Sequence, residues 1–214
     1  MRIAHVSSVF HEVCLDSNSQ EGRSIAVLAM GLCRLRYDVT VFASSDSAVS
    51  GALVPVAQRA LRHQPIPKRH LSEGLIHLAL EKAFAASPSF DLIHVHAGLA
   101  AFPLMRRSPV PIMATVYEPL DAPEVVRVYD EFKELALVAT SLEQIRRCPD
   151  LNWQAIVPWN GDPKDSSRLS KRAGGLEEIA SVYAAAYERI ASAQLSRFRP
   201  SPTASSPKQL ARSV

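Results

Sequence analysis

The segments RIAHVSS (residues 2–8), YDVTVFAS (37–44) and DLIHVH (91–96) decide the fold class of this chain. Each places a short apolar run, rich in residues that favour strands, directly before small or polar loop residues. The intervals between the segments are long enough for crossover helices, so we interpret them as parallel strands of a doubly wound α/β sheet. Ligands of such sheets bind beyond the carboxyl ends of the strands, so the loops after these segments are the predicted place of function.

Three later apolar runs, centred on Ile112, Leu137 and Ile156, complete a mostly parallel sheet of six predicted strands. A helix is expected to begin near residue 18, where Asn18 can cap the helix and Glu21 can reach back to the Asn18 amide. Residues 45–69 contain three prolines and are expected to be irregular, without a long helix.

The length of 214 residues is sufficient for one well-packed core but not for two α/β domains of about 100–200 residues each. No apolar stretch approaches the ~20 residues of a membrane span, and the chain opens directly into a strand without a secretory signal. We therefore expect a cytoplasmic protein. The three cysteines, Cys14, Cys33 and Cys148, are odd in number and lack metal-type spacing, so neither a disulfide framework nor a cysteine metal site is predicted.

Basic charge is concentrated at the end of the chain. Residues 162–214 hold nine basic and five acidic side chains, whereas residues 1–161 hold 15 and 16. A basic tail can bind anionic lipid or nucleic acid, but charges spread among Ser and Pro are more typical of a solvated, disordered end. We predict disorder over residues 196–214 and no nucleic-acid partner.

Histidines in the predicted strands are the first candidates for a chemical role. We predict that His94 and His96 point to opposite faces of the sheet, so that they cannot bind one metal ion, and no metal site is expected. His96 lies nearer the strand end and is predicted to face a ligand, whereas His5 and His94 are expected to be core residues. Phosphate-binding glycine loops, dinucleotide fingerprints and nucleophile elbows are absent from the sequence, which disfavours a nicotinamide enzyme.

Four segments in order resemble the N-terminal domain of family 4 glycosyltransferases: the opening strand, residues 35–44, residues 90–96 and residues 151–161. The resemblance covers roughly residues 1–161 and implies one half of a GT-B fold, in which two Rossmann-like domains face each other across a cleft. It implies transfer of a sugar from a nucleotide sugar to an acceptor hydroxyl, without a metal or other cofactor.

The resemblance also assigns residues to roles. Ser19 and Gln20 stand where the family usually has a paired glycine near the donor phosphate or the acceptor, and the neighbouring Gly22 and Arg23 favour an anionic ligand at the helix N-terminus. Tyr117 and Glu118 occupy the reactive loop, where the family often has a histidine followed by a small residue. These positions, with His96, are the predicted substrate-binding and catalytic residues.

The chain after Gly161 is too short for the family's donor-binding domain, since only 53 residues follow it. We predict a Rossmann-like domain over residues 1–160, a linker over 161–175 and a C-terminal helix over 176–195, which resembles the closing helix of the family and docks back on the domain. We therefore expect a truncated glycosyltransferase-like protein that is incomplete or inactive alone. The alternative is a non-catalytic binding module that offers its exposed cleft to a protein partner.

Overall fold

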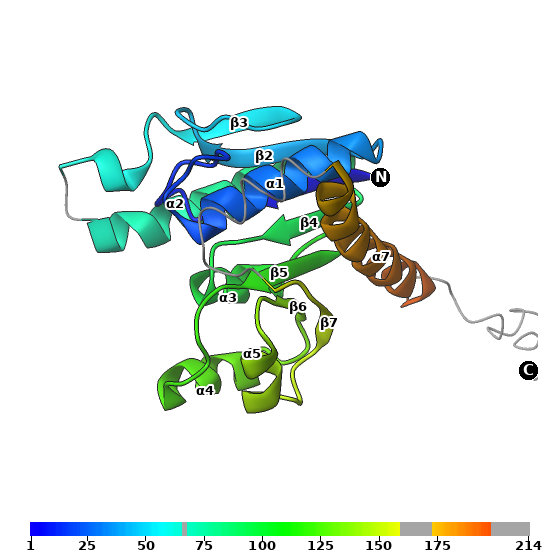
Figure 1. Cartoon of the computed structure of the whole chain (residues 1–214). Helices are drawn as coiled ribbons and strands as arrows, with labels where there is room; N and C mark the ends of the chain where they lie inside the picture. The colour runs from blue at the N-terminus through cyan, green and yellow to red at the C-terminus, as the bar shows by residue number, and fades with distance from the viewer. Residues whose placement is uncertain (66–67, 159–172, 198–214) are drawn as a thin grey trace, which may run out of the picture.

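The computed structural model describes residues 1–65, 68–158 and 173–197, which contain a seven-stranded parallel sheet in the order β3-β2-β1-β4-β5-β6-β7 (Figure 1). All six strand pairings are parallel. The predicted doubly wound α/β fold with a C-terminal helix is therefore confirmed. The strands are β1 (Arg2–Val6), β2 (Asp38–Ser44), β3 (Ala52–Ala57), β4 (Leu92–Val95), β5 (Ile112–Val116), β6 (Ala136–Ala139) and β7 (Trp153–Ile156).

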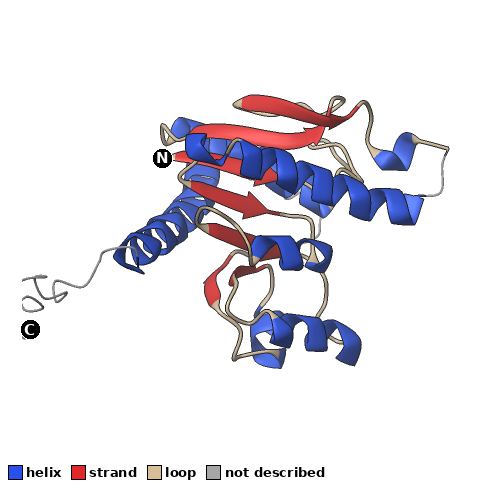
Figure 2. Ribbon diagram, turned by 180° about the vertical axis from the view of Figure 1, so that it is seen from behind, coloured by secondary structure: helices blue, strands red, loops and turns tan. Residues whose placement is uncertain are grey.

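Helices cover both faces of the sheet, and each face has its own apolar core. One face is covered by α1 and α7, and the view from behind shows α2 on the other face (Figure 2). The core under α2 also receives side chains from α3 and α4. The helices are α1 (Gln20–Arg34), α2 (Lys68–Ala85), α3 (Phe102–Met105), α4 (Pro123–Glu131), α5 (Leu142–Arg147) and α7 (Ala173–Arg197). Within the described part of the chain, no helix combines the length and apolar character needed to cross a lipid bilayer.

Strand β3 was not predicted, because the prolines of residues 45–69 were taken to indicate irregular structure. The strand lies at the edge of the sheet and pairs only with β2, with Pro55 opposite Ala43. Proline lacks the amide that a central strand must donate, but an edge strand tolerates it. The proline therefore identifies the edge and does not exclude a strand.

The start of α1 also differs from the prediction. Ser19 is the N-cap, and its hydroxyl accepts from the Gly22 amide. Glu21 does not reach back to Asn18, because its carboxylate binds Ser8 in the loop after β1. The capping box predicted from Asn18 and Glu21 is therefore wrong, and Glu21 connects the helix to the end of the first strand.

The C-terminal helix α7 packs against α1 at a point of close backbone approach. A Cβ on Gly31 of α1 would lie 2.6 Å from the Leu176 carbonyl oxygen and 2.8 Å from the Ala180 Cβ. Leu176, Ala180, Tyr183 and Tyr187 of α7 are all buried. The two helices can therefore approach this closely only because residue 31 is glycine, which has no Cβ. The predicted linker over 161–175 falls largely, and the predicted tail over 196–214 almost wholly, outside the described residues.

The helix contact predicts opposite effects for two glycine substitutions. We expect Gly31→Ala to lower the free energy of unfolding by about 1–3 kcal/mol, because the added methyl overpacks the α1–α7 contact. Gly74→Ala in α2 is the control: no atom lies within 4 Å of its added Cβ, so we expect it to stabilise by about 0.5–1 kcal/mol through helix propensity. Urea unfolding of both variants measures the difference, and equal effects would contradict the close contact.

Candidate functional site

The candidate site lies where the direction of winding changes, between β1 and β4. From β1 the chain builds outward through β2 and β3, whereas β4 begins the series that runs to β7 on the other side. Ligands of doubly wound sheets bind beyond the strand ends at such a switch point, and we call the region between the loops that meet here the crevice. The loops that meet there follow β1, β4 and β5. The strand pattern predicted the first two, but it also predicted the loop after β2, which leads to β3 and away from the switch point. The three loops at the crevice carry Ser8, His96, Gly98, Tyr117 and Glu118.

Glu21 joins the first turn of α1 to the loop after β1. Its Oε1 accepts from the Ser8 amide at 2.7 Å, and its Oε2 accepts from the Ser8 hydroxyl at 2.8 Å. Burial raises the pKa of Glu21 to about 7, although the Ser8 bonds lower it, and the negative charge of Glu118 raises it further. The side chain is therefore a carboxyl group that exchanges its proton near neutral pH. From the sequence, Glu21 was expected only to cap the helix through the Asn18 amide.

Glu118 is the second carboxylate of the crevice. Its Oε1 accepts from the Tyr129 hydroxyl at 2.8 Å, and its Oε2 accepts from the Tyr117 amide at 3.2 Å. Opposite lies Gly98 with φ +68°, where a Cβ would stand 3.3 Å from Glu118 Oε1. Glycine therefore both permits this loop conformation and leaves space beside the carboxylate.

The loop that carries Tyr117 and Glu118 is held from below by Gln144 of α5. The Gln144 side chain donates to the Glu118 carbonyl at 2.9 Å and to the Val116 carbonyl at 3.1 Å. Its Oε1 accepts from the Thr140 amide at 2.7 Å. Ser141 caps α5, and the sequence contained no signal that Gln144 also fixes the loop after β5.

Beneath the crevice, on the α1 and α7 side of the sheet, three histidines form a buried cluster. His5 Nδ1 lies 3.1 Å from His96 Nε2, and His96 Nδ1 lies 2.9 Å from the Tyr117 hydroxyl. The rings of His94 and His96 have their centroids 4.0 Å apart. Burial lowers the pKa of His5 to about 3 and moves the pKa values of His94 and His96 well below their usual range, so all three rings are neutral.

The prediction that His94 and His96 point to opposite faces is wrong. Side chains alternate along a strand, so residues two positions apart share a face. The prediction treated His94 and His96 as if they were adjacent in the strand. His5 pairs with His94 across β1 and β4 and lies on the same face. Their orientation therefore does not prevent these residues from binding one metal ion.

Two tyrosines of α7 extend the cluster into the helix layer. The Tyr187 hydroxyl lies 2.8 Å from His94 Nδ1, and the Thr115 hydroxyl lies 2.8 Å from His94 Nε2 and 3.2 Å from the Tyr183 hydroxyl. All four side chains are buried. Polar groups without water must find partners, and here each helix tyrosine finds one on the sheet.

The predicted residues of α1 lie beside the crevice but make internal contacts. Gly22 is packed so tightly that a Cβ would lie 2.4 Å from the Glu12 carbonyl oxygen. Arg23 is 9% exposed, and its guanidinium donates to the Ser17 carbonyl. Ser19 and Gln20 are partly exposed at the start of the helix. Arg23 therefore supports the loop before α1, and Ser19 and Gln20 form its outer surface.

The loop after β1 also contains a strained residue. Val9 has φ +60°, and its side chain is completely buried. A β-branched residue in this region is a genuine outlier, and such strain collects near functional sites. The Val9 amide donates to the Ser7 hydroxyl at 3.2 Å, and its carbonyl accepts from the Leu61 amide at 3.1 Å. These bonds and the burial hold the loop in this conformation.

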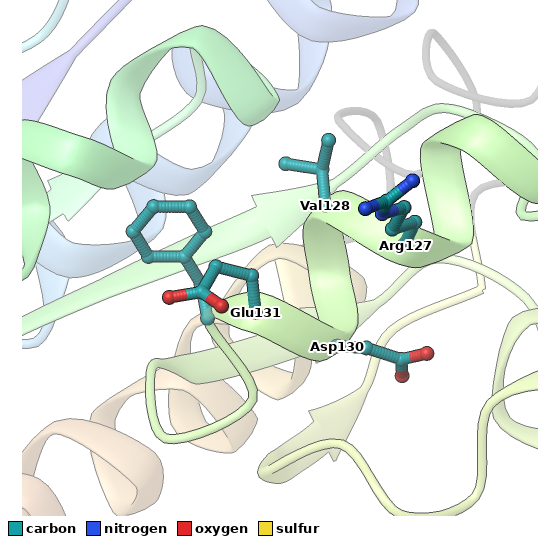
Figure 3. A pocket seen from close by; sticks show the side chains of 5 residues that line it. Arg127, Val128, Asp130 and Glu131 are labelled. Atoms are coloured by element: carbon teal, nitrogen blue, oxygen red, sulfur yellow. The ribbon is translucent and has the colours of Figure 1, made fainter.

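A hollow on the α4 surface is separate from the crevice. Figure 3 shows its lining on and just after α4, formed by Arg127, Val128, Asp130, Glu131 and Phe132. Arg106 forms an ion pair with Glu131 at 3.0 Å and lies 4.2 Å from the centre of the Phe132 ring. These contacts account for Glu131 and Phe132 of the lining without a ligand.

Comparisons with known proteins agree with this architecture. Residues 22–148 match the sequence model of Glycosyltransferase Family 4. A sucrose-phosphate synthase from Thermosynechococcus elongatus superposes with a TM-score of 0.52 and 14% identity, over 74% of this chain and 48% of that chain. A shorter sucrose-phosphate synthase chain from the same organism gives a TM-score of 0.48 and 16% identity, over 80% of this chain and 96% of that chain.

These structural likenesses concern the fold alone, because the identities are low. The chain spans about half the length of the longer synthase chain. No curated protein sequence matches it.

The tyrosine contacts predict unequal effects for two Tyr→Phe substitutions. Tyr187→Phe removes a hydroxyl from His94 and leaves a buried nitrogen without a partner, so we expect a loss of about 1–3 kcal/mol in the free energy of unfolding. Tyr37→Phe is the matched control, since its exposed hydroxyl bond to Glu188 should contribute less than about 0.5 kcal/mol. Urea unfolding compares the two, and a neutral Tyr187→Phe variant would contradict the role of the contact.

The buried histidines predict that acid destabilises the fold. Their pKa values are lowered in the folded state, so the unfolded chain binds more protons below about pH 6.5. Stability should fall from that pH downward by up to about 1.4 kcal/mol per histidine and pH unit.

Glu21 affects stability in the opposite sense. Its pKa is raised to about 7, so its stabilising contribution is complete below about pH 4.5 and is lost as the pH rises through 7.

Urea unfolding midpoints measured between pH 5 and pH 8 test both pH dependences: the loss of stability in acid from the histidines and the loss toward higher pH from Glu21. In Glu21→Gln the decline toward pH 8 should disappear, and the decline toward pH 5 should become steeper. The control His77→Gln replaces an exposed histidine of α2 and should leave the profile unchanged. A flat wild-type profile between pH 5 and pH 6.5 would show that the three rings are not held neutral.

Proposed function

Because the chain belongs to glycosyltransferase family 4, we propose that the crevice between β1 and β4 binds the hydroxyl acceptor of a sugar-transfer reaction. The carboxyl groups of Glu21, in the first turn of α1, and Glu118, in the loop after β5, carry this proposal, because they are near enough for the charge of Glu118 to raise the pKa of Glu21. Carboxylate oxygens accept hydrogen bonds from sugar hydroxyls, whereas two of them side by side repel a phosphate group. The crevice therefore suits a neutral, hydroxyl-rich acceptor better than the phosphates of a donor.

Glu118 is the proposed group that orients the reacting hydroxyl and accepts its proton. Tyr117 is unsuited to that role, because burial raises its pKa well above 10 and keeps the phenol neutral. Its hydroxyl lies against His96 Nδ1, so both residues support the loop from beneath the crevice. Ser8, just after β1, fixes Glu21 through its backbone amide and its hydroxyl.

The donor is proposed to be a nucleotide sugar that approaches from the side of the α1 N-terminus. Ser19 and Gln20 are the partly exposed residues of this end, and their hydroxyl and amide groups can donate hydrogen bonds to a phosphate that stays outside the Glu21–Glu118 pair. Gly22 and Arg23 shape the preceding loop from within. No metal or organic cofactor takes part in the proposed transfer step.

We further propose that the 214-residue chain binds acceptor but does not transfer sugar alone. The described residues form one Rossmann-like domain, and a second domain facing the crevice is not among them. The same observation supports the second candidate function, a non-catalytic module that presents the crevice to a protein partner. Acceptor binding distinguishes the two, because only the first requires affinity for sugar hydroxyls.

Thermal unfolding with a panel of sugars and with UDP- and GDP-sugars tests the proposal. An acceptor at 100 times its dissociation constant should stabilise the chain by about 2.7 kcal/mol. Glu118→Gln should reduce this stabilisation strongly, whereas Glu124→Gln on the exposed start of α4 serves as the control and should not. Absence of any sugar effect, or an equal effect in both variants, would refute acceptor binding at the crevice.

A transfer assay separates the question of turnover from that of binding. Homogeneous chain incubated with UDP- or GDP-sugar and an acceptor should release no nucleotide and form no glycoside. Turnover would overturn the proposed dependence on a donor-binding half while leaving the acceptor site in place.

A further inference from the structure

We propose that the buried cluster of His5, His94 and His96 binds one divalent transition-metal ion of the zinc class, as a structural site beneath the crevice. Each of the three residues offers one ring nitrogen, and these nitrogens all lie within 4.8 Å of one another. The residues come from β1 and from the end of β4, and they are 0%, 0% and 2% exposed. This inference is independent of the proposed sugar transfer.

The ligand chemistry of the cluster selects the class of ion. Neutral imidazole binds zinc, copper and nickel well, whereas magnesium and calcium prefer oxygen ligands. Imidazole must be neutral to bind a metal, and burial keeps all three rings in that form. No ligand therefore has to lose a proton before the ion binds, unlike at a cysteine site.

An unsatisfied nitrogen in the cluster is the second observation. His5 Nε2 is buried and has no hydrogen-bond partner. Its other nitrogen lies 3.1 Å from His96 Nε2, an arrangement in which one nitrogen must carry a hydrogen and the other must accept it. A buried ring that satisfies only one of its nitrogens is uncommon, so the hydrogen bonds within the cluster leave His5 with unused binding capacity.

The spacing is close to that of a metal site. Bonds of about 2.0–2.1 Å place two tetrahedral nitrogen ligands about 3.4 Å apart, which is near the His5–His96 separation of 3.1 Å. The other pairs of ring nitrogens in the cluster are no more than 4.8 Å apart, a limit that exceeds the ideal separation. Binding therefore moves the outermost ring inward by at most roughly 1.4 Å, a displacement on the scale of a side-chain rotation.

The surrounding hydroxyls form the outer shell that such sites need. Tyr117 lies against His96 Nδ1, so His96 can bind with Nε2 while the phenol holds the ring. His94 has a hydroxyl at each nitrogen and gives up one of them on binding. The hydroxyl released in this way, from Tyr187 or Thr115, is the candidate for the fourth ligand. If Tyr187 is that ligand, its proton leaves to solvent during refolding, before the cluster closes, and the phenolate reduces the buried positive charge.

Metal loading of the full chain tests the proposal. Because the cluster is closed to solvent, the chain is unfolded in urea, refolded with one equivalent of Zn²⁺ or Co²⁺, and separated from free metal. We expect one ion per chain, and the Co²⁺ protein should show the visible absorption of a four-coordinate site. X-ray absorption of the Zn²⁺ protein should count three imidazoles, a measurement that needs no variant.

Variants give a graded response. Tyr117→Phe removes an outer-shell hydroxyl and should weaken affinity by about 10–100-fold, and His5→Gln removes a ligand and should weaken it further. His77→Gln is the control and should bind as the wild type does. Circular dichroism of the metal-free variants verifies folding. The proposal is overturned if the refolded wild type retains no ion, if His77→Gln lowers affinity as much as His5→Gln does, or if fewer than three imidazoles are counted.

Discussion

The hydrogen bond between Tyr187 of α7 and His94 of β4 connects the two layers on which the architecture depends. It places a polar group of the last helix against a polar group in the centre of the sheet, where water does not reach. An apolar contact tolerates sliding, whereas a buried hydrogen bond requires one register and one orientation. The position of α7 along the sheet is therefore fixed by this bond and by the Tyr183–Thr115 contact, with Gly31 setting the distance to α1.

The same layer supports the crevice from below. His96 and Tyr117 connect the buried cluster to the loops after β4 and β5, and Gln144 also holds the latter loop. Glu118 thus has a fixed backbone, and its carboxylate accepts from Tyr129 and from the Tyr117 amide. The arrangement follows the general requirement that groups at a site be held by residues that are themselves packed. The carboxylates, not a phosphate-binding glycine loop, give this crevice its chemical character.

The fold was predictable from the sequence because its signals are local. Short apolar runs before small residues identified six strands, and the lengths between them required parallel pairing. Strand β3 was missed because Pro55 was interpreted without knowledge of which strand forms the edge, a property of the whole sheet. The site was less predictable, since Glu21 contacts a residue 13 positions away and Tyr187 contacts one 93 positions away. Pairings at that distance leave no local pattern. The error on His94 and His96 had another cause. The two-residue period of a strand already implies that both side chains lie on the same face.

The separation of 93 residues between His94 and Tyr187 has a consequence for the order in which the protein folds. Closing such a long loop is slow in comparison with pairing of neighbouring strands and helices, so α7 joins after the sheet has begun to form. Until then water reaches the imidazoles of β1 and β4. The arrival of the helix is thus a desolvation step, and a proton on any of these rings must leave before the step is complete. Acid therefore acts on the rate of the last stage of folding as well as on its equilibrium.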